Sequence, residues 1–455
     1  MYKWLIAILF LGSSTTIAQT NNVSAPSIVA GPMIGHVELR TAAIWFQLAN
    51  NTSTVQVTYN LPGSAKKENA SITFAEGPYK IAKATLTALE PGTKYNYTIK
   101  IGAKQVATGE VTTQQLWQYR MPAPDFSFIT GSCTYFNETK YDRPGNPYGK
   151  HDTAIFTAIT KEKADFMFWL GDNWYTREVD YFSEWGLYYR PFHYRSQPIL
   201  QPLWKKMPHY AIWDDHDYGW NNSDKSYPFK ETSRKAFQAF WANPTYGENG
   251  EGIYTKITWN DVDVFMMDDR YFRTNDDMID SINGQPNPDK RMWGKKQLEW
   301  LKSALLQSQY NSNISFRIIA TGSQVLNELS PFDCMYGHPA EFNELMQFLD
   351  AHKINGIVFL TGDRHHSEII KRERPGNYTL YDITASSLTA GVSKPHKQEE
   401  PHPNRLFPAI VENNYSKISI YGTKQDRRLK VEFMNIKGER ITEWSVSLKE
   451  LSSPK

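Results

Sequence analysis

Short apolar runs alternate with segments of helical periodicity along most of this chain, and this alternation limits the folds that it can adopt. Apolar residues return at helical spacing near 152–163, near 231–242, from Leu298 to Leu305 and from Phe342 to Leu349. Strand-forming runs that alternate with such helices are typical of layered α/β domains with buried strands. The runs lie at 126–130, 166–170, 209–213, 262–267, 316–320 and 357–360.

The two ends of the chain are rich in strand signals. Three strand-like segments lie between 417 and 448, and we expect them to complete the sheet of an α/β domain that spans 125–455. Short alternating segments separated by Asn, Pro and Gly predict an all-β sandwich at 24–113. Its segment LEPGTKYNYTIKIG, at 89–102, resembles a loop and strand of fibronectin type III and related Ig-like sandwiches. Residues 114–124 are expected to link the two domains.

The N-terminal residues have the pattern of a secretory signal peptide. Lys3 precedes an apolar run from Trp4 to Leu11, and small polar residues lead to an expected cleavage site after Ala18. The alternative is a buried N-terminal helix. The run is too short to span a bilayer, and no later stretch approaches the roughly 18 apolar residues that a spanning helix needs. We therefore expect signal peptide 1–18 and a mature protein that is secreted or periplasmic.

The composition excludes several classes of protein. Lys and Arg number 50 against 48 Asp and Glu, which gives a net charge of +2, and 40% of residues are hydrophobic. A disordered tail, a strongly basic nucleic-acid binder and a collagen-like fibre are therefore excluded. The sequence contains no stripe of basic residues that would indicate a surface for binding nucleic acid. The two cysteines, Cys133 and Cys334, could form one disulfide in an oxidising compartment, but Cys133 follows a strand-like run, where a thiolate would lie beside a site.

Polar and ionisable residues follow nearly every apolar run. In layered α/β folds, ligands bind at the carboxyl ends of the strands, so these residues are candidates for one site. A single Asp after a strand often only caps a helix. Five such groups at one edge instead indicate several bound cations, which keep neighbouring carboxylates ionised. The groups are Gly131-Ser132-Cys133, Gly171-Asp172-Asn173-Trp174-Tyr175, Asp214-Asp215-His216-Asp217, Asp268-Asp269-Arg270 and Gly362-Asp363-Arg364-His365-His366.

These motifs resemble those of the calcineurin-like metallophosphoesterases. More closely, the ordered set GSC, LGDNWY, WDDHDYGWNN, DDRYFR and TGDRHH resembles the alkaline phosphatase D (PhoD-type) family, whose members also carry an N-terminal β-sandwich. The resemblance spans nearly the whole expected mature chain. It implies an α/β fold, a metallophosphoesterase-type β-sandwich flanked by helices, and a metal-dependent hydrolase of phosphate esters.

The resemblance also implies a set of metal ligands. Asp172 would bridge two ions, and Cys133, Tyr175 and His365 would complete the shell of the first. A phenolate ligand at neutral pH favours a strongly acidic ion such as Fe³⁺, because the free phenol has a pKa of about 10. Asp215, Asp363 and Asn221 would hold the second site, with Asn222 as the alternative to Asn221. Oxygen ligands suit Ca²⁺ there, with Mg²⁺, Mn²⁺ or Zn²⁺ as alternatives.

Further residues are candidates for contacts with the substrate. His216 would stabilise the phosphate or protonate the leaving group, and Arg270 resembles the phosphate-binding Arg of the family. Arg364 and Asn173 are weaker candidates for substrate binding, and the alternative for Arg364 is a salt bridge. Asp217 and His366 are expected to orient ligands, whereas Asp214, Asp268 and Asp269 are expected to be structural.

Three functions compete on the sequence. The first is an exported phosphatase of small-molecule or lipid phosphate esters, and the second is a phosphodiesterase or phospholipase-like enzyme with the same centre. The segments 178–208 and 274–291 are expected to form the lid that distinguishes them. The third is a non-catalytic glycan or surface binder. Oligomeric state and natural substrate are left open.

Overall fold

Two six-stranded sheets form the centre of the protein, whose computed structural model describes residues 27–52, 54–149 and 153–454. The predicted signal peptide lies outside these residues. The first sheet has the order β11 (His209–Ile212), β10 (Phe166–Leu170), β9 (Phe126–Gly131), β20 (Asn414–Tyr421), β21 (Arg428–Asn435) and β22 (Arg440–Ser447). The second has the order β12 (Thr255–Trp259), β13 (Val262–Met266), β16 (Phe316–Ala320), β17 (Ile357–Thr361), β19 (Leu380–Thr384) and β18 (Glu368–Arg372).

The strand directions explain how the segments far apart in the sequence come together. Strands β9, β10 and β11 are parallel, as are β13, β16, β17 and β19. Strand β20 pairs antiparallel with β9, so the C-terminal strands extend the first sheet. The two sheets meet in a shared apolar core, where the Phe166 and Trp259 rings lie 5.0 Å apart. The predicted β-sandwich is thus present.

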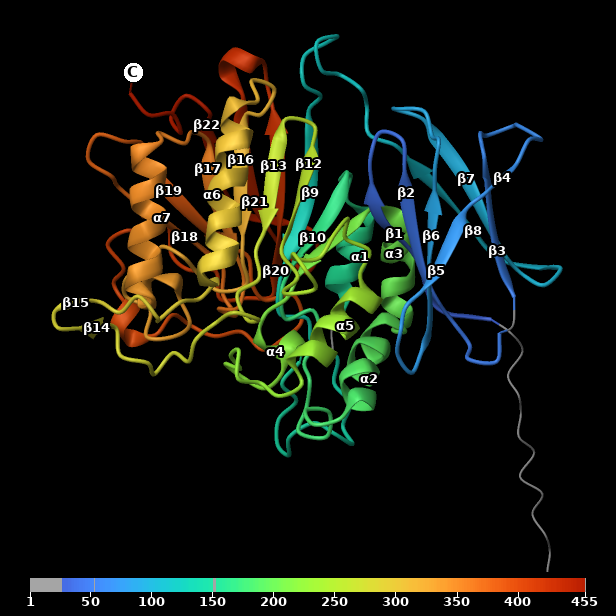
Figure 1. Ribbon diagram of the computed structural model, residues 1–455, viewed down its shortest axis with the longest axis horizontal. Coiled ribbons are helices and arrows are strands. Elements are labelled where there is room, and N and C mark those ends of the chain that lie inside the picture. The colour runs from blue at the N-terminus through green and yellow to red at the C-terminus, as the bar shows by residue number, and fades with distance from the viewer. Residues whose placement is uncertain (1–26, 53, 150–152, 455) are drawn as a thin grey trace, which may run out of the picture.

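Helices cover the outer faces of the sheets (Figure 1). Helix α6 (Gly294–Tyr310) has Leu298, Leu301 and Leu305 buried, as the spacing predicted, and it packs beside α7 (Pro339–Ala351) over the second sheet. The helices are α1 (Ala154–Lys161), α2 (Glu184–Arg195), α3 (Gln201–Lys206), α4 (Asp215–Tyr218), α5 (Lys230–Phe240), α6 (Gly294–Tyr310) and α7 (Pro339–Ala351). Short 3-10 helices lie at Pro198–Leu200, Met335–Gly337, Lys397–Glu399 and Lys424–Asp426, and a small hairpin joins β14 (Ser281–Ile282) to β15 (Gln285–Pro286).

The N-terminal strands form two antiparallel sheets of four strands each, drawn in blue in Figure 1. One has the order β1 (Ile28–Val37), β2 (Ala42–Leu48), β6 (Lys80–Leu86) and β5 (Ser71–Phe74). The other has the order β4 (Glu68–Asn69), β3 (Val55–Asn60), β7 (Lys94–Ile101) and β8 (Lys104–Thr112). Their alternating burial matches the predicted all-β sandwich.

This sandwich is docked against the rest of the chain. Trp45 Nε1 donates a hydrogen bond of 2.8 Å to the carbonyl of Ala239 in α5. In the predicted linker, Gln114 Nε2 donates to the carbonyls of both Val37 and Thr258, at 2.9 and 3.2 Å. The boundaries of the two domains stay predictions. Among the helices of the described residues, none has the length and apolar character to cross a membrane.

Candidate metal centre

The residues that follow strands β9, β10, β11 and β17 converge at one edge of the two sheets. Three overlapping groups of side chains each place one donor atom per residue within 4.8 Å of the others. The convergence follows from the topology, because the carboxyl ends of parallel strands share an edge. The groups are Cys133, Asp172 and His365; Asp172, Asp215 and His216; and Asp214, Asp215 and Asp363.

The first group combines sulfur, carboxylate and imidazole donors, and the Tyr175 phenol lies beside it. Cys133 Sγ lies 3.6 Å from Asp172 Oδ2, and Tyr175 OH lies 3.2 Å from His365 Nε2. The other ring nitrogen of His365, Nδ1, contacts the carbonyl of Gly391. Because that contact occupies Nδ1, Nε2 is the nitrogen of this ring left to bind an ion.

The second group is rich in oxygen. Asp215 accepts hydrogen bonds from the backbone N–H groups of His216 and Asn222, at 2.8 and 2.7 Å. Asp172 accepts a third from His216 N at 3.3 Å. Asn221 Nδ2 donates to Asn222 Oδ1 at 2.8 Å, and both amides are exposed beside Asp215. These contacts leave the choice between Asn221 and Asn222 open.

The backbone at the candidate ligands has an unusual conformation. Cys133, Asp172, Asp363 and His365 have φ angles of 58°, 50°, 65° and 58°, in the left-handed region that non-glycine residues seldom adopt. Each such residue costs about 1–3 kcal/mol, and this kind of strain clusters at functional sites. Four of the candidate ligands therefore share a feature that their sequence motifs alone do not require.

Burial makes this cluster of acids costly without added positive charge. Burial, with Cys133 and neighbouring carboxylates, raises the pKa of Asp172 well above its usual value, and burial and nearby aspartates raise that of Asp363 to about 7. Burial also raises the pKa of the Cys133 thiol to about 11. For Asp215, burial is outweighed by His216, Arg270 and backbone N–H donors, so its pKa is lowered to about 2.

The donor set fits metal ions. A thiol, an imidazole and a phenol gathered with one carboxylate suit a transition metal, whereas the carboxylates and amide oxygens beside them suit Ca²⁺, Mg²⁺ or Mn²⁺. Cations would also offset the mutual repulsion of the buried Asp172, Asp215 and Asp363. The chemistry of these residues is thus compatible with two adjacent ions that share Asp172 as a ligand.

Arg270 lies in a buried, acidic environment beside the centre. Its side chain is fully buried, and its Nε donates to Asp214 Oδ1 at 2.7 Å. Its Nη2 donates to Asp333 Oδ2 at 2.7 Å and to Ser323 Oγ at 3.2 Å. These contacts hold Arg270 beside two carboxylates, whereas its Nη1 has no hydrogen-bond partner among the described residues, so the predicted phosphate contact stays a prediction.

Arg364 and Asn173, which were also predicted to contact the substrate, form hydrogen bonds within the protein. Arg364 Nη2 donates to both carboxylate oxygens of Glu399, each at 2.8 Å, so the salt-bridge alternative describes it. Asn173 Nδ2 donates to Asp217 Oδ2 at 3.2 Å and to the carbonyl of Ile212 at 2.8 Å. Both side chains are buried, and their predicted contacts with a substrate stay predictions.

Two residues were expected to orient the ligands, Asp217 and His366, and of the two, Asp217 contacts the turn that carries a candidate ligand. Asp217 accepts hydrogen bonds from the N–H groups of Asn173 and Trp174, at 2.9 and 3.2 Å, and thereby orients the turn that carries Asp172. His366 Nε2 lies 3.5 Å from Glu368 Oε1. The predicted structural acids have such roles too: Asp214 caps α4, Asp268 accepts from Trp213 Nε1, and Asp269 accepts from Ser323 N.

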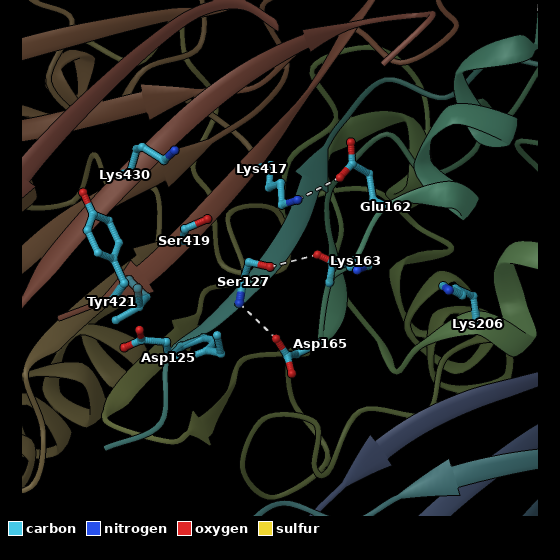
Figure 2. A pocket seen from close by; sticks show the side chains of 13 residues that line it. Asp125, Ser127, Glu162, Lys163, Asp165, Lys206, Lys417, Ser419, Tyr421 and Lys430 are labelled. Carbon is cyan, nitrogen blue, oxygen red and sulfur yellow. Dashed lines mark hydrogen bonds and ion pairs between the residues drawn. The ribbon is translucent and has the colours of Figure 1, made fainter. Parts of the chain in front are cut away.

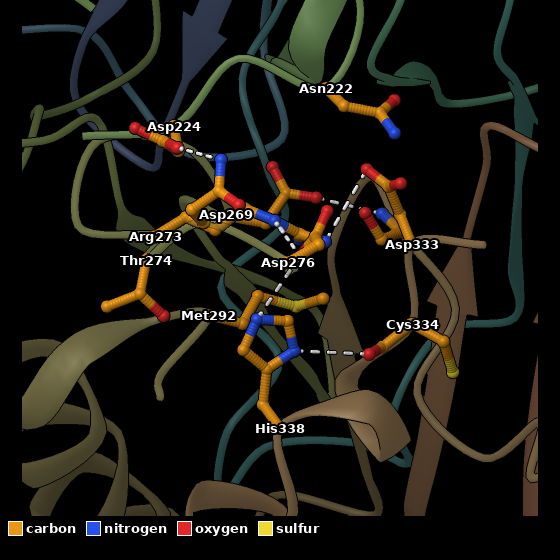
Figure 3. A network of polar contacts seen from close by, with 12 residues as sticks. Asn222, Asp224, Asp269, Arg273, Thr274, Asp276, Met292, Asp333, Cys334 and His338 are labelled. Atoms are coloured by element: carbon orange, nitrogen blue, oxygen red, sulfur yellow. Dashed lines mark hydrogen bonds and ion pairs between the residues drawn. The ribbon is translucent and has the colours of Figure 1, made fainter. Parts of the chain in front are cut away.

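A network of polar contacts joins Arg273, Asp276, Asp333 and His338 (Figure 3), and Asp333 links it to Arg270. Arg273 Nη2 lies 2.8 Å from Asp276 Oδ1 and 3.5 Å from Asp333 Oδ2. His338 Nε2 approaches Asp276 Oδ1 at 3.4 Å, while its Nδ1 lies 3.2 Å from the carbonyl of Cys334. The network ties Asp276, in the predicted lid segment 274–291, to Arg273 and His338.

A cavity of about 570 Å³ opens onto the centre, and its walls include residues that the sequence did not single out. The segment 142–148 lines it together with Tyr181 of the predicted lid segment 178–208, whereas no residue of the other predicted segment, 274–291, is among its lining residues. The one signal in the sequence is the length of the connection between β9 and α1, which is rich in Asn, Pro and Gly. The cavity is lined by Tyr135, Asp142, Arg143, Pro144, Asn146, Tyr148, Tyr175, Thr176, Arg177, Tyr181, His216 and Asn221.

A wider hollow of about 840 Å³ lies at the opposite, amino-terminal end of strands β9 and β10 (Figure 2). Several of its charged groups are paired: Lys417 Nζ lies 2.8 Å from Glu162 Oε2, and Asp165 accepts from Ser127 N at 3.0 Å. No cluster of candidate metal ligands among the described residues lies there. The clusters of candidate metal ligands found among the described residues lie at the carboxyl edge.

The two cysteines are separate. Cys133 and Cys334 are both buried free thiols, so the disulfide alternative is wrong. Cys334 Sγ lies 3.4 Å from the carbonyl of Asn327, outside the group that contains Cys133. Cys133 is thus available as a ligand.

Comparisons with known proteins agree with this geometry. Residues 128–433 match the family described as PhoD-like phosphatase, and residues 25–116 match a domain of unknown function (DUF7800). Alkaline phosphatase D of Bacillus subtilis (strain 168) is 26% identical over 323 residues. The match covers 61% of this chain and 52% of that protein, so the chain spans about half the length of this curated relative.

Two solved structures share the fold. A structure of PhoD has a TM-score of 0.69 at 16% identity and covers 93% of this chain and 91% of its own. Purple acid phosphatase PPD1 from seeds of yellow lupin (Lupinus luteus) has a TM-score of 0.67 at 12% identity and covers 95% of this chain and 77% of its own. These likenesses confirm the predicted fold class.

Proposed function

Because the chain belongs to the PhoD-like phosphatase family, we propose that it is a metal-dependent hydrolase of phosphate esters that acts at the carboxyl edge of its two sheets. The observation that carries the proposal is the convergence of Cys133, Asp172, Asp215 and His365, from four different strands, beside an open cavity. We infer that Cys133, Asp172, Tyr175 and His365 hold one ion, with iron favoured by the phenol and the thiol. Asp172, Asp215, Asp363 and Asn221 or Asn222 would hold a divalent ion, of which Ca²⁺ is favoured.

When bound, such ions supply Lewis acidity, which activates water and offsets negative charge on the phosphoryl group. The chain itself supplies orientation. Asp215 and Asp172 are fixed by the N–H of His216, and the His216 ring lies 4.2 Å from the Tyr175 ring, at the wall of the cavity. Burial lowers the pKa of His216 to about 4, so the neutral ring can hydrogen-bond a phosphoryl or leaving-group oxygen.

Two finer points also belong to the proposal. The predicted signal peptide supports export of the protein. The cavity of about 570 Å³ exceeds the size of a phosphate group, so a diester is the alternative substrate to a monoester. A non-catalytic binder would have no use for a strained, buried set of ionisable groups.

Substitution of the shared carboxylate tests the proposal. Asp172→Asn keeps the shape of the side chain but removes the charge that two ions would share, so we expect kcat/KM to fall by more than about a hundredfold. The measurements are metal content by elemental analysis, the visible spectrum, and hydrolysis of 4-nitrophenyl phosphate and bis(4-nitrophenyl) phosphate. The ratio of the two activities separates a phosphatase from a phosphodiesterase.

Asp289→Asn is the matched control, because Asp289 is exposed and carries the same change of charge. It should keep both activity and metal content. Hydrolysis by Asp172→Asn at the rate of the unsubstituted protein would contradict the proposal, as would wild-type protein that is active without metal.

A further inference from the structure

Tyrosine rings form much of the wall of the cavity that opens onto the centre. Four of its lining residues are Tyr135, Tyr148, Tyr175 and Tyr181. Tyr135 and Tyr148 meet edge to face with centroids 4.9 Å apart, and Tyr148 meets Tyr175 in the same way at 5.7 Å. The rings therefore support one another in a fixed arrangement from the centre to the mouth.

Tyr148 connects the cavity to the candidate ligands. Its hydroxyl lies 3.1 Å from His365 Nε2, on which Tyr175 OH also converges at 3.2 Å. The residue is nevertheless 46% exposed. Its hydroxyl end is thus held at the centre while part of its ring faces the open space.

The loop that carries Tyr148 is held in place at both ends. Asn137 Nδ2 donates to the carbonyl of Gly149 at 2.8 Å, and Gly149 N donates back to Asn137 Oδ1 at 3.1 Å. Asp142, in the middle of the loop, accepts from Glu138 N at 2.7 Å and from Tyr135 OH at 3.0 Å. These hydrogen bonds fix the loop, so Tyr148 is part of a defined wall of the cavity.

The charged groups in the wall are already paired. Arg143 forms an ion pair of 2.8 Å with Glu178, and Arg177 lies 3.5 Å from Asp142 with its guanidinium stacked 4.1 Å from the Tyr135 ring. These charges are paired with one another, and the ring of Tyr148, which meets Tyr135 and Tyr175 edge to face, keeps part of its surface exposed at the wall. An apolar planar group could cover it without breaking an ion pair.

We propose that this cavity binds the alcohol portion of the ester, that it prefers an aromatic group there, and that Tyr148 sets the preference. The inference rests on the proposed function, since the phosphate must sit at the centre. A ligand whose phosphorus group is held beside His216 would extend its substituent along the ring of Tyr148. Stacking or edge contact with that ring favours an aryl group over a methyl group by about three- to tenfold in affinity.

Phosphonates test the inference without any chemical step. Phenylphosphonate and methylphosphonate share the anionic group and differ in the substituent, so the ratio of their dissociation constants measures the cavity alone. Isothermal titration with metal-loaded protein should give about three- to tenfold tighter binding of phenylphosphonate. In Tyr148→Leu the ratio should approach one, whereas Tyr148→Phe, which keeps the ring, should preserve it.

Tyr310→Leu is the control for loss of a tyrosine, because Tyr310 is 88% exposed at the end of α6. Circular dichroism and metal content confirm that each variant is folded and loaded. Equal binding of both phosphonates to the wild-type protein, or an unchanged ratio in Tyr148→Leu, would overturn the inference alone. Failure of the wild-type protein to bind either phosphonate would contradict the proposed function together with it.

Discussion

Arg364 shows at the residue scale how the partner of a side chain decides its role. The motif TGDRHH places this cation between two candidate ligands, where it could bind phosphate. In the fold, both its side chain and that of Glu399 are almost completely buried, at 4% and 0% exposure, and they form a two-point ion pair. A charge in that position is costly once its partner is removed.

We therefore predict that Glu399→Gln lowers the free energy of unfolding by about 3 kcal/mol, because it leaves Arg364 buried without a counter-charge. Urea unfolding measures the change. Glu373→Gln is the control, because the ion pair of Glu373 with Lys371 is exposed and should contribute little to the free energy of unfolding. Loss of hydrolysis by Glu399→Gln at unchanged stability would instead assign Arg364 to substrate binding.

At the scale of elements, the turns after the strands are as constrained as the strands. Gly171, between β10 and Asp172, has a φ of +92°, and a Cβ there would lie 2.7 Å from Asp214 Cβ. Gly362, after β17, is equally confined: its Cβ would lie 2.7 Å from the carbonyl of Leu170. The two glycines let the ends of β10, β11 and β17 approach closely enough for their acids to share ions.

Gly171→Ala should therefore destabilise the protein and reduce its metal content, because the clash displaces the turn that carries Asp172. Gly63→Ala is the matched control: Gly63 has a φ of +79° but no atom within 4 Å of its added Cβ. The control should lose only the backbone contribution of about 1–2 kcal/mol, and Gly171→Ala should lose more. Thermal unfolding and elemental analysis measure the two effects, and equal losses would contradict the steric explanation.

At the scale of the whole molecule, the N-terminal sandwich and the α/β layers share a buried polar interface. The hydroxyl of Tyr210, in β11, accepts a hydrogen bond from Val37 N and contacts His36 Nδ1, both at 3.2 Å. Glu38 lies 3.5 Å from the other ring nitrogen of His36. Burial lowers the pKa of His36 to about 4.

This interface should weaken in acid. The pKa of His36 is about 4 when folded and about 6.5 when unfolded, so between these values the unfolded chain binds more protons. Protonation of His36 in the unfolded chain should therefore lower the free energy of unfolding by about 1–3 kcal/mol as the pH falls from 6.5 to 4. Glu38 should offset part of this loss. Urea unfolding across this range should show a smaller pH dependence for His36→Gln than for the wild-type protein. Identical profiles would contradict the prediction.

The sequence alone predicted the layered α/β fold, the all-β N-terminal region and the residues that converge at one edge. Apolar runs fix which segments are strands, and parallel strands bring the residues after them to a common edge, so Cys133, Asp172, Asp215 and His365 could be selected by position. These inferences depend on local patterns and on one topological rule. The predicted fold class is confirmed, and the roles of the selected residues stay predictions.

Only the tertiary structure decided which partners the polar side chains have. In the sequence, Arg270 and Arg364 both resemble phosphate-binding arginines. In the fold, each forms an ion pair with a buried acid that is distant in the chain. Tyr148 belongs to a loop without periodicity, and its approach to His365 spans 217 residues. No local pattern encodes such contacts, because they depend on how the layers and loops pack in three dimensions.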